Sequence, residues 1–271
     1  MSAPAAPRAA FRAQSAGFRL HERACRSGLS CWLALPDRPR PGARPLIAVH
    51  GIGRAARLKA ETFAARAAAQ GRAVIAPLYD EAFWNGYQRA VAPRRADLAL
   101  LELLKDLRAE GVVDAAGFDL FGYSGGAQFA HRFALLYPHL VGRLSLGAAG
   151  WWTFPDAAPY PYGLGGDGWG ARMAAGLPRF LGLDIVVTIG AQDCEPDDAT
   201  RRGEAIDAQQ GVDRLTRARA WVAALREAAA ARALAPPRIR LAVLPDAGHD
   251  FADCAAAGDG LLVTLTLGDA S

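Results

Sequence analysis

The chain has 271 residues, a length that suits one α/β enzyme domain, and 52% of them are hydrophobic, which provides a sizeable core and argues against intrinsic disorder. The net charge is +4, but the arginines are scattered and form no basic stripe with interleaved aromatic residues, so we expect no nucleic-acid partner. No apolar run approaches the ~20 residues of a membrane span, so we expect no membrane partner.

The first 17 residues are rich in Ala, Pro and Arg and contain no apolar stretch like that of a secretory signal. We expect residues 1–17 to be a disordered leader and residues 18–271 to form a single domain. The four cysteines lack the spacing of a metal site, and we expect a cytoplasmic protein, in which free thiols are the default. A disulfide between Cys194 and Cys254 is an open alternative, because both lie near residues predicted to be functional.

Eight short apolar segments are predicted as strands, and most of them alternate with predicted helices. The strands are residues 18–24, 29–35, 46–49, 73–76, 118–121, 140–146, 183–189 and 239–244. The helices are residues 58–70, 94–110, 125–137, 212–234 and part of 251–267. Residues 150–182 are predicted as an irregular, aromatic-rich excursion. This alternation predicts an α/β fold with a mostly parallel central sheet of about eight strands and helices on both faces.

One segment has the form of a nucleophile elbow. Residues Gly122-Tyr123-Ser124-Gly125-Gly126 match the pattern G-x-S-x-G and fall between a predicted strand and a predicted helix. Such a turn lifts a serine hydroxyl clear of the sheet, and its glycines let the strand and the helix approach closely. The helix that follows directs its positive end toward any negative charge that forms there. We therefore predict that Ser124 is a nucleophile; an ordinary Gly-rich turn is the alternative.

A second glycine-containing loop follows the strand at residues 46–49. It reads His50-Gly51-Ile52-Gly53-Arg54, and its glycines allow backbone rather than side chains to face a ligand. An oxyanion hole needs two backbone N–H donors near the substrate carbonyl. We predict that Ile52 and Gly125 supply them, and that His50 braces the loop. A plain turn is the alternative.

An aspartate and a histidine follow two later strands. Asp193 lies just past the strand at 183–189, and His249 lies past the last strand. Of the five histidines, only His249 combines a loop after a strand with the chain order Ser, Asp, His. We predict that His249 is the general base and that Asp193 orients it. The alternatives for the acid are nearby loop carboxylates: Asp197, Asp198 and Glu195.

These motifs resemble the α/β-hydrolase superfamily over about residues 18–267. The residues that carry the resemblance are His50-Gly51-x-Gly53-Arg54, Gly122-x-Ser124-x-Gly126, Asp193 and Gly248-His249. Residues 121–130, followed by Tyr137-Pro138, also resemble the polyhydroxybutyrate-depolymerase and feruloyl-esterase-like branch. The resemblance implies the α/β-hydrolase fold and a serine hydrolase with a catalytic triad and an oxyanion hole.

We expect a carboxylesterase-like enzyme that cleaves an ester-type acyl bond of an apolar or aromatic small molecule through an acyl-enzyme, with neither a metal nor an organic cofactor. Aromatic residues are expected to contact the substrate; the alternative is that they only pack a loop against the domain. They are Trp84, Tyr123, Trp151, Trp152 and Phe154. A peptidase or amidase, an acyltransferase and a non-catalytic binding protein remain alternatives. The oligomeric state is not specified by the sequence.

Overall fold

The computed structural model of the chain describes residues 17–24 and 28–268. The leader predicted at residues 1–17 lies outside the described residues, apart from Gly17. Among the described residues, no helix combines the length and the apolar character needed to cross a membrane.

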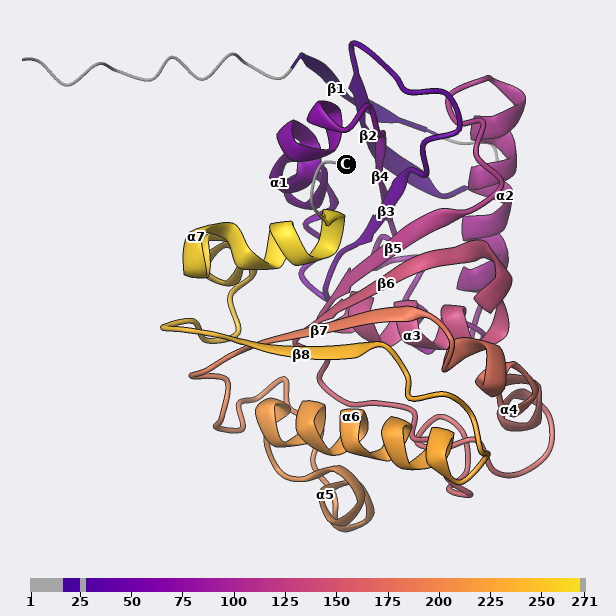
Figure 1. Cartoon of the computed structure of the whole chain (residues 1–271), viewed down its shortest axis with the longest axis vertical. Helices are drawn as coiled ribbons and strands as arrows, with labels where there is room; N and C mark the ends of the chain where they lie inside the picture. The colour runs from indigo at the N-terminus through magenta and orange to yellow at the C-terminus, as the bar shows by residue number, and fades with distance from the viewer. Residues whose placement is uncertain (1–16, 25–27, 269–271) are drawn as a thin grey trace, which may run out of the picture.

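Eight strands form one sheet in the order β1-β2-β4-β3-β5-β6-β7-β8, which confirms the predicted fold class (Figure 1). β1 and β2 form an antiparallel hairpin, β2 pairs antiparallel with β4, and all later pairs are parallel. The strands are β1 (Phe18–Arg23), β2 (Ser30–Pro36), β3 (Leu46–Val49), β4 (Val74–Leu78), β5 (Phe118–Tyr123), β6 (Val141–Gly147), β7 (Asp184–Gly190) and β8 (Ile239–Leu244). In such a sheet, ligands bind beyond the carboxyl ends of the parallel strands.

Helices cover both faces of the sheet (Figure 1). α1 (Ala56–Ala69) and α7 (Phe251–Leu267) share one face, and α7 is interrupted by non-helical backbone at 257–260. The other face carries α2 (Ala96–Ala109), α3 (Gly125–Leu136), α4 (Trp169–Phe180) and α6 (Arg214–Ala230). The short α5 (Glu204–Gln210) lies against α6.

The parallel strands are buried on both faces because alternate residues enter two different cores. On β3, Ile47 and Val49 enter the core under α2 and α3, whereas Leu46 and Ala48 enter the core under α1 and α7. All four residues are fully buried. This double burial explains why the strand reads as a continuous apolar run with no polar residue between its members.

Two α-helices in the described part of the chain were not predicted from the sequence. α4 lies inside the excursion at 150–182, so the prediction of irregular chain was wrong for residues 169–180. The Gly- and Pro-rich surroundings and Pro178 within the helix mask its buried face, which Met173, Leu177 and Phe180 form at helical spacing. α5 spans only seven residues, too few to give a clear periodic pattern.

Candidate active site

Ser124 lies at the sharp turn between β5 and α3. Its backbone has φ 53° and ψ −115°, a strained conformation for a residue with a side chain. The turn is held by the Ser124 N–H, which donates to the Gly147 carbonyl of β6 at 2.8 Å, and by the Ser124 carbonyl, which accepts from Ala127 at 3.0 Å. The side chain is only partly buried, so its hydroxyl is raised to the carboxyl edge of the sheet as the motif predicts.

The glycines beside Ser124 are required by close backbone contacts. A Cβ at Gly122 would lie 2.2 Å from the Gly126 carbonyl oxygen, and a Cβ at Gly126 would lie 2.3 Å from the carbonyl oxygen of Val49. Both distances are far below ordinary van der Waals contact, and both involve backbone atoms that cannot rotate away. The motif is therefore a steric condition for packing β5, α3 and β3 together at this point.

A chain of hydrogen bonds links Ser124, His249 and Asp193. With its proton on Nδ1, His249 donates to Asp193 Oδ2 at 2.7 Å, and its Nε2 accepts from the Ser124 hydroxyl at 3.1 Å. Asp193 follows β7 and is 3% exposed, and His249 lies in the loop between β8 and α7. The structure thus brings together three side chains that come from three separate loops.

The second oxygen of Asp193 is bound by a buried arginine. Arg214, the first residue of α6, donates to Asp193 Oδ1 at 3.0 Å and to Asp197 Oδ1 at 2.6 Å. The side chains of Arg214 and Asp193 are each 2% exposed, whereas that of Asp197 is 49% exposed. Asp197, an alternative acid in the sequence, therefore binds Arg214 and Thr200, while His249 bonds to Asp193.

The loop at 50–54 packs directly against the serine. A Cβ at Gly51 would lie 3.3 Å from the Ser124 Cβ, and a Cβ at Gly125 would lie 3.4 Å from the Ile52 nitrogen. Gly125 opens α3, so its N–H has no partner inside the helix. The Ile52 nitrogen therefore lies close to the first residue of α3, beside Ser124.

His50, the first residue of this loop, is fully buried and fixes the loop through hydrogen bonds. Its Nε2 accepts from the Tyr79 N–H at 3.0 Å, its Nδ1 donates to the Gly51 carbonyl at 2.7 Å, and its own carbonyl accepts from the Tyr87 hydroxyl at 2.6 Å. Burial lowers the pKa of His50 to about 4. Its ring is thus neutral and fully used as a donor and an acceptor, which agrees with the bracing role predicted for it.

Tyr123 supports the loop that carries His249. Its hydroxyl donates to the His249 carbonyl at 3.1 Å, and its ring packs edge-on against Phe251 at 5.0 Å between centroids. The ring is 3% exposed, and burial raises the pKa of its hydroxyl. We predicted a substrate contact for Tyr123; the structure instead places it beneath the site, where it fixes the histidine loop to β5.

The other predicted substrate contacts are also buried: Trp84, Trp151, Trp152 and Phe154. Trp152 is stacked on Trp221 of α6 with ring centroids 4.2 Å apart. Its neighbour Thr153 donates a backbone N–H to His131 of α3 at 3.0 Å. Their burial favours the packing alternative: Trp152 packs the loop after β6 against α3 and α6, and Trp84 packs the loop after β4 against Tyr79. The sequence could not distinguish these roles, because an aromatic residue in a long loop suits either one.

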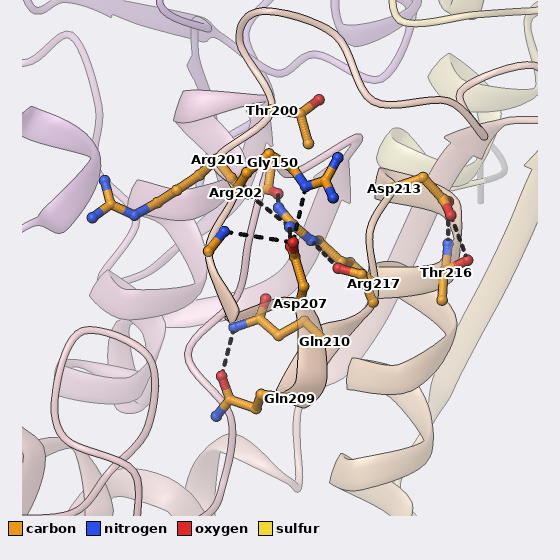
Figure 2. A network of polar contacts seen from close by, with 12 residues as sticks. Gly150, Thr200, Arg201, Arg202, Asp207, Gln209, Gln210, Asp213, Thr216 and Arg217 are labelled. Atoms are coloured by element: carbon orange, nitrogen blue, oxygen red, sulfur yellow. Dashed lines mark hydrogen bonds and ion pairs between the residues drawn. The ribbon is translucent and has the colours of Figure 1, made fainter. Parts of the chain in front are cut away.

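Arg217 ties the loop after β6 to the segment after β7 (Figure 2). Its fully buried guanidinium donates to the Gly150 carbonyl at 2.8 Å, the Arg201 carbonyl at 2.7 Å and the Gly211 carbonyl at 2.8 Å. It also forms an ion pair with Asp207 at 2.9 Å. One buried cation therefore fixes two loops that flank the site, and nothing in the local sequence indicated it.

Cys194 and Cys254 are not bonded to each other, so the disulfide alternative is not realised. Cys194 is exposed, whereas the buried Cys254 thiol donates to the Gly248 carbonyl at 3.3 Å. Burial raises the pKa of the Cys254 thiol. Within the part of the chain that the structure describes, no group of three or more His, Cys, Asp or Glu side chains is arranged to hold a metal.

The rim of the site is exposed and partly apolar. The side chain of His249 is 29% exposed and Ile52 is 56% exposed, whereas Phe83, in the loop after β4, is 48% exposed and is covered by the Arg94 guanidinium. A large cavity of about 750 Å³ lies elsewhere, near the amino ends of β3 and β5, and its lining includes Arg38, Arg40, Arg44 and Arg72. Ser124 and His249 therefore lie at the carboxyl edge of the sheet, at the opposite end of the strands from this cavity.

Neither a protein-family model nor a curated protein matches the sequence. Solved structures do match. The chain is similar to a poly(aspartic acid) hydrolase from Sphingomonas sp. KT-1, with a TM-score of 0.77 and 25% identity over 93% of this chain and 99% of that chain. It is also similar to a poly(3-hydroxybutyrate) depolymerase from Bordetella parapertussis, with a TM-score of 0.71 and 26% identity over 82% of this chain and 79% of that chain. An S-formylglutathione hydrolase from Agrobacterium tumefaciens shares the fold, with a TM-score of 0.56 and 13% identity over 90% of this chain and 91% of that chain.

Proposed function

The chain belongs to the α/β-hydrolase superfamily, and on that premise we propose that it is a serine hydrolase with Ser124 as nucleophile, His249 as general base and Asp193 as the residue that orients the histidine. The observation that carries the proposal is the hydrogen-bonded order Ser124–His249–Asp193 at a strained turn, with distances of 3.1 and 2.7 Å. Each side chain has the partner that its role needs.

The proposed reaction is acyl transfer to water. His249 Nε2 takes the proton of Ser124 as the hydroxyl oxygen attacks the substrate carbonyl carbon, and the carbonyl oxygen becomes an anion. The N–H groups of Ile52 and Gly125 stabilise this oxyanion, and α3 directs its positive end toward the same point. His249 then protonates the leaving group as its bond to carbon breaks. Water, deprotonated by His249, releases the acid and restores Ser124.

We propose an ester as the bond cleaved. The exposed apolar side chain of Ile52 lies against Gly125, next to the proposed nucleophile, which favours a substrate with an apolar group close to the scissile bond. Amide hydrolysis is the second candidate. It is favoured by the likeness to a protein described as a poly(aspartic acid) hydrolase, since poly(aspartic acid) is joined by amide bonds.

The test is a panel of p-nitrophenyl esters of increasing acyl length beside the matching p-nitroanilides, with Ser124→Ala as the blank. We expect the wild-type protein to turn over the esters and the variant to lose about 10⁴-fold or more in kcat. Circular dichroism of the variant checks that the fold is intact. Turnover of anilides at rates close to those of the esters supports the amide candidate, and undiminished ester turnover by the variant contradicts Ser124 as nucleophile.

A further inference from the structure

A charged pair, Arg214 and Asp197, lies behind the proposed triad. Asp193 uses both carboxylate oxygens: Oδ2 accepts from His249, and Oδ1 accepts from Arg214 at 3.0 Å. The same guanidinium donates through its other terminal nitrogen to Asp197 at 2.6 Å. The groups therefore follow one another from the half-exposed carboxylate of Asp197 through the buried cation of Arg214 and the buried carboxylate of Asp193 to the partly exposed imidazole of His249.

We infer that Arg214 is a positioning residue for the proposed reaction, which orients Asp193 and partly neutralises its charge, and that Asp197 adjusts the strength of this effect. The inference rests on the proposed function. The electrostatics of the triad are then set by residues of α6 and of the loop after β7.

The position of Arg214 supports a fixed orientation. It begins α6 directly after Asp213, whose side chain caps the helix by accepting from the Thr216 N–H at 2.7 Å. The next residue, Leu215, donates its backbone N–H to the Asp193 carbonyl at 3.1 Å. The start of α6 is thus bound to Asp193 through both backbone and side chain, and a guanidinium with 2% exposure has little freedom to leave this position.

Burial and charge explain why the arginine matters. A carboxylate removed from water is costly unless it is paired. Burial alone would lower the pKa of Arg214, but its bonds to Asp197 and Asp193 outweigh burial and raise it, so the cation persists. The same arginine holds the pKa of Asp197 well below its ordinary value. A permanent positive charge next to Asp193 weakens the stabilisation that this carboxylate gives to the imidazolium formed at His249.

Other charged or titratable groups surround the pair. Tyr123 of β5 and Cys254 of α7 face it, and burial raises the pKa of both, so both are neutral near pH 7. Asp250 follows His249, and Lys59 of α1 lies over the Phe251 ring with its nitrogen 3.3 Å from the centroid. Burial lowers the pKa of Lys59 to about 7. Among the described residues, the side chains of Arg214 and His249 are those that hydrogen-bond to the Asp193 carboxylate, and Arg214 is the one that carries a permanent charge.

Replacing Arg214 and replacing Asp197 should shift the pH–rate profile of kcat/KM in opposite directions. In Arg214→Gln, Asp193 is no longer neutralised and holds the imidazolium more strongly, so the midpoint of the acid limb moves up by about 1 pH unit. In Asp197→Asn, the whole charge of Arg214 acts on Asp193 and the midpoint moves down. We also expect Arg214→Gln to lose about 10- to 100-fold in kcat, with a smaller change in KM, by analogy with residues that orient a reactive group through another residue.

The experiment compares these variants with Arg214→Lys and Arg217→Gln on one ester substrate. Arg214→Lys keeps the charge and should restore the midpoint toward the wild-type value. Arg217 is the other buried arginine of α6, it pairs with Asp207, and it makes no contact with Asp193. Its variant should lower the melting temperature without moving the midpoint.

Asp197→Asn removes a half-exposed carboxylate and decides the matter even where Arg214→Gln fails to fold. A downward shift in this variant supports the inference, and an unmoved or raised midpoint overturns it. Loss of ester turnover in Ser124→Ala, measured in the same assay, keeps the two questions separate. If Ser124→Ala is inactive but the midpoints do not move, only the role of Arg214 is wrong. If Ser124→Ala is active, the proposed function itself is wrong.

Discussion

Around Ser124 the backbone is held by close packing, whereas around Asp193 it is held by a buried ion pair. On the elbow side, Gly122 and Gly126 lie where a Cβ would approach a backbone oxygen to 2.2 or 2.3 Å. On the acid side, Arg214 bonds to two carboxylates at 3.0 and 2.6 Å. Steric requirements of the first kind restrict the residue type at neighbouring positions and so appear as a motif, whereas an ion pair of the second kind leaves no fixed spacing in the sequence.

Replacing Asp193 should have the largest effect on kcat among the changes around the buried ion pair. Asp193→Asn should lower kcat by about 10⁴-fold, because the amide no longer fixes the histidine tautomer that accepts the serine proton. Asp197→Asn is the matched control, since Asp197 bonds to Arg214 and Thr200 rather than to His249. Steady-state ester turnover at the pH optimum of each variant measures both effects. A larger loss in Asp197→Asn than in Asp193→Asn would show that the roles of the two acids are reversed.

Around Ser124, the corresponding change is to add a Cβ at Gly126, which lies in tight contact with neighbouring backbone. In Gly126→Ala, the new Cβ would lie 2.3 Å from the Val49 carbonyl and 2.5 Å from that of His50. We expect a loss of about 3 kcal/mol in the free energy of unfolding, because both neighbours are backbone of a central strand and the loop after it. Gly53→Ala, where a Cβ meets nothing within 4 Å, is the control and should change stability little. Equal urea midpoints for the two variants would contradict the steric account.

Lowering the pH should weaken the interactions around Ser124 before it weakens the ion pair around Asp193. Burial lowers the pKa of His50 from 6.5 to about 4, so the unfolded chain takes up a proton at a higher pH than the folded chain does. The stability due to neutral His50 is therefore complete above about pH 6.5 and is lost as the pH falls toward 4, by about 1.4 kcal/mol per pH unit. Over the same range the Arg214–Asp197 pair persists, because the pKa of Asp197 lies well below its ordinary value.

Urea unfolding from pH 7 to pH 4.5 measures this effect. His50→Gln keeps an acceptor for the Tyr79 N–H but does not titrate, so its stability should fall less steeply with pH than that of the wild type. His139→Gln changes an exposed histidine and should leave the slope as it is. Parallel slopes for His50→Gln and the wild type would show that His50 is not the group responsible.

Sequence reasoning predicted the fold because buried parallel strands and their helices leave a strong periodic pattern. Ser124, Asp193 and His249 could be named because each follows a strand, and the carboxyl ends of parallel strands meet at one edge of the sheet. The Ile52 loop was found in the same way. These features follow from the order of strands and helices and from steric limits at glycine positions, and both can be recognised in a single sequence.

The remaining features depend on contacts between distant segments. Arg214 lies 21 residues beyond Asp193, and Arg217 reaches Gly150 across 67 residues, so no spacing rule indicates either contact. The aromatic residues were assigned to the substrate because loop position alone does not reveal burial. Trp152 and Trp221 stack only because the loop after β6 folds back over α6, and this depends on side-chain packing of the whole domain.

The most direct test of the central claim is labelling with a fluorophosphonate, which reacts with an activated serine. We expect one label per chain, located on Ser124 by mass spectrometry of the digested protein, and no label on Ser124→Ala or on unfolded protein. Labelling of another serine, or equal labelling of the wild type and Ser124→Ala, would contradict a nucleophile at the turn between β5 and α3.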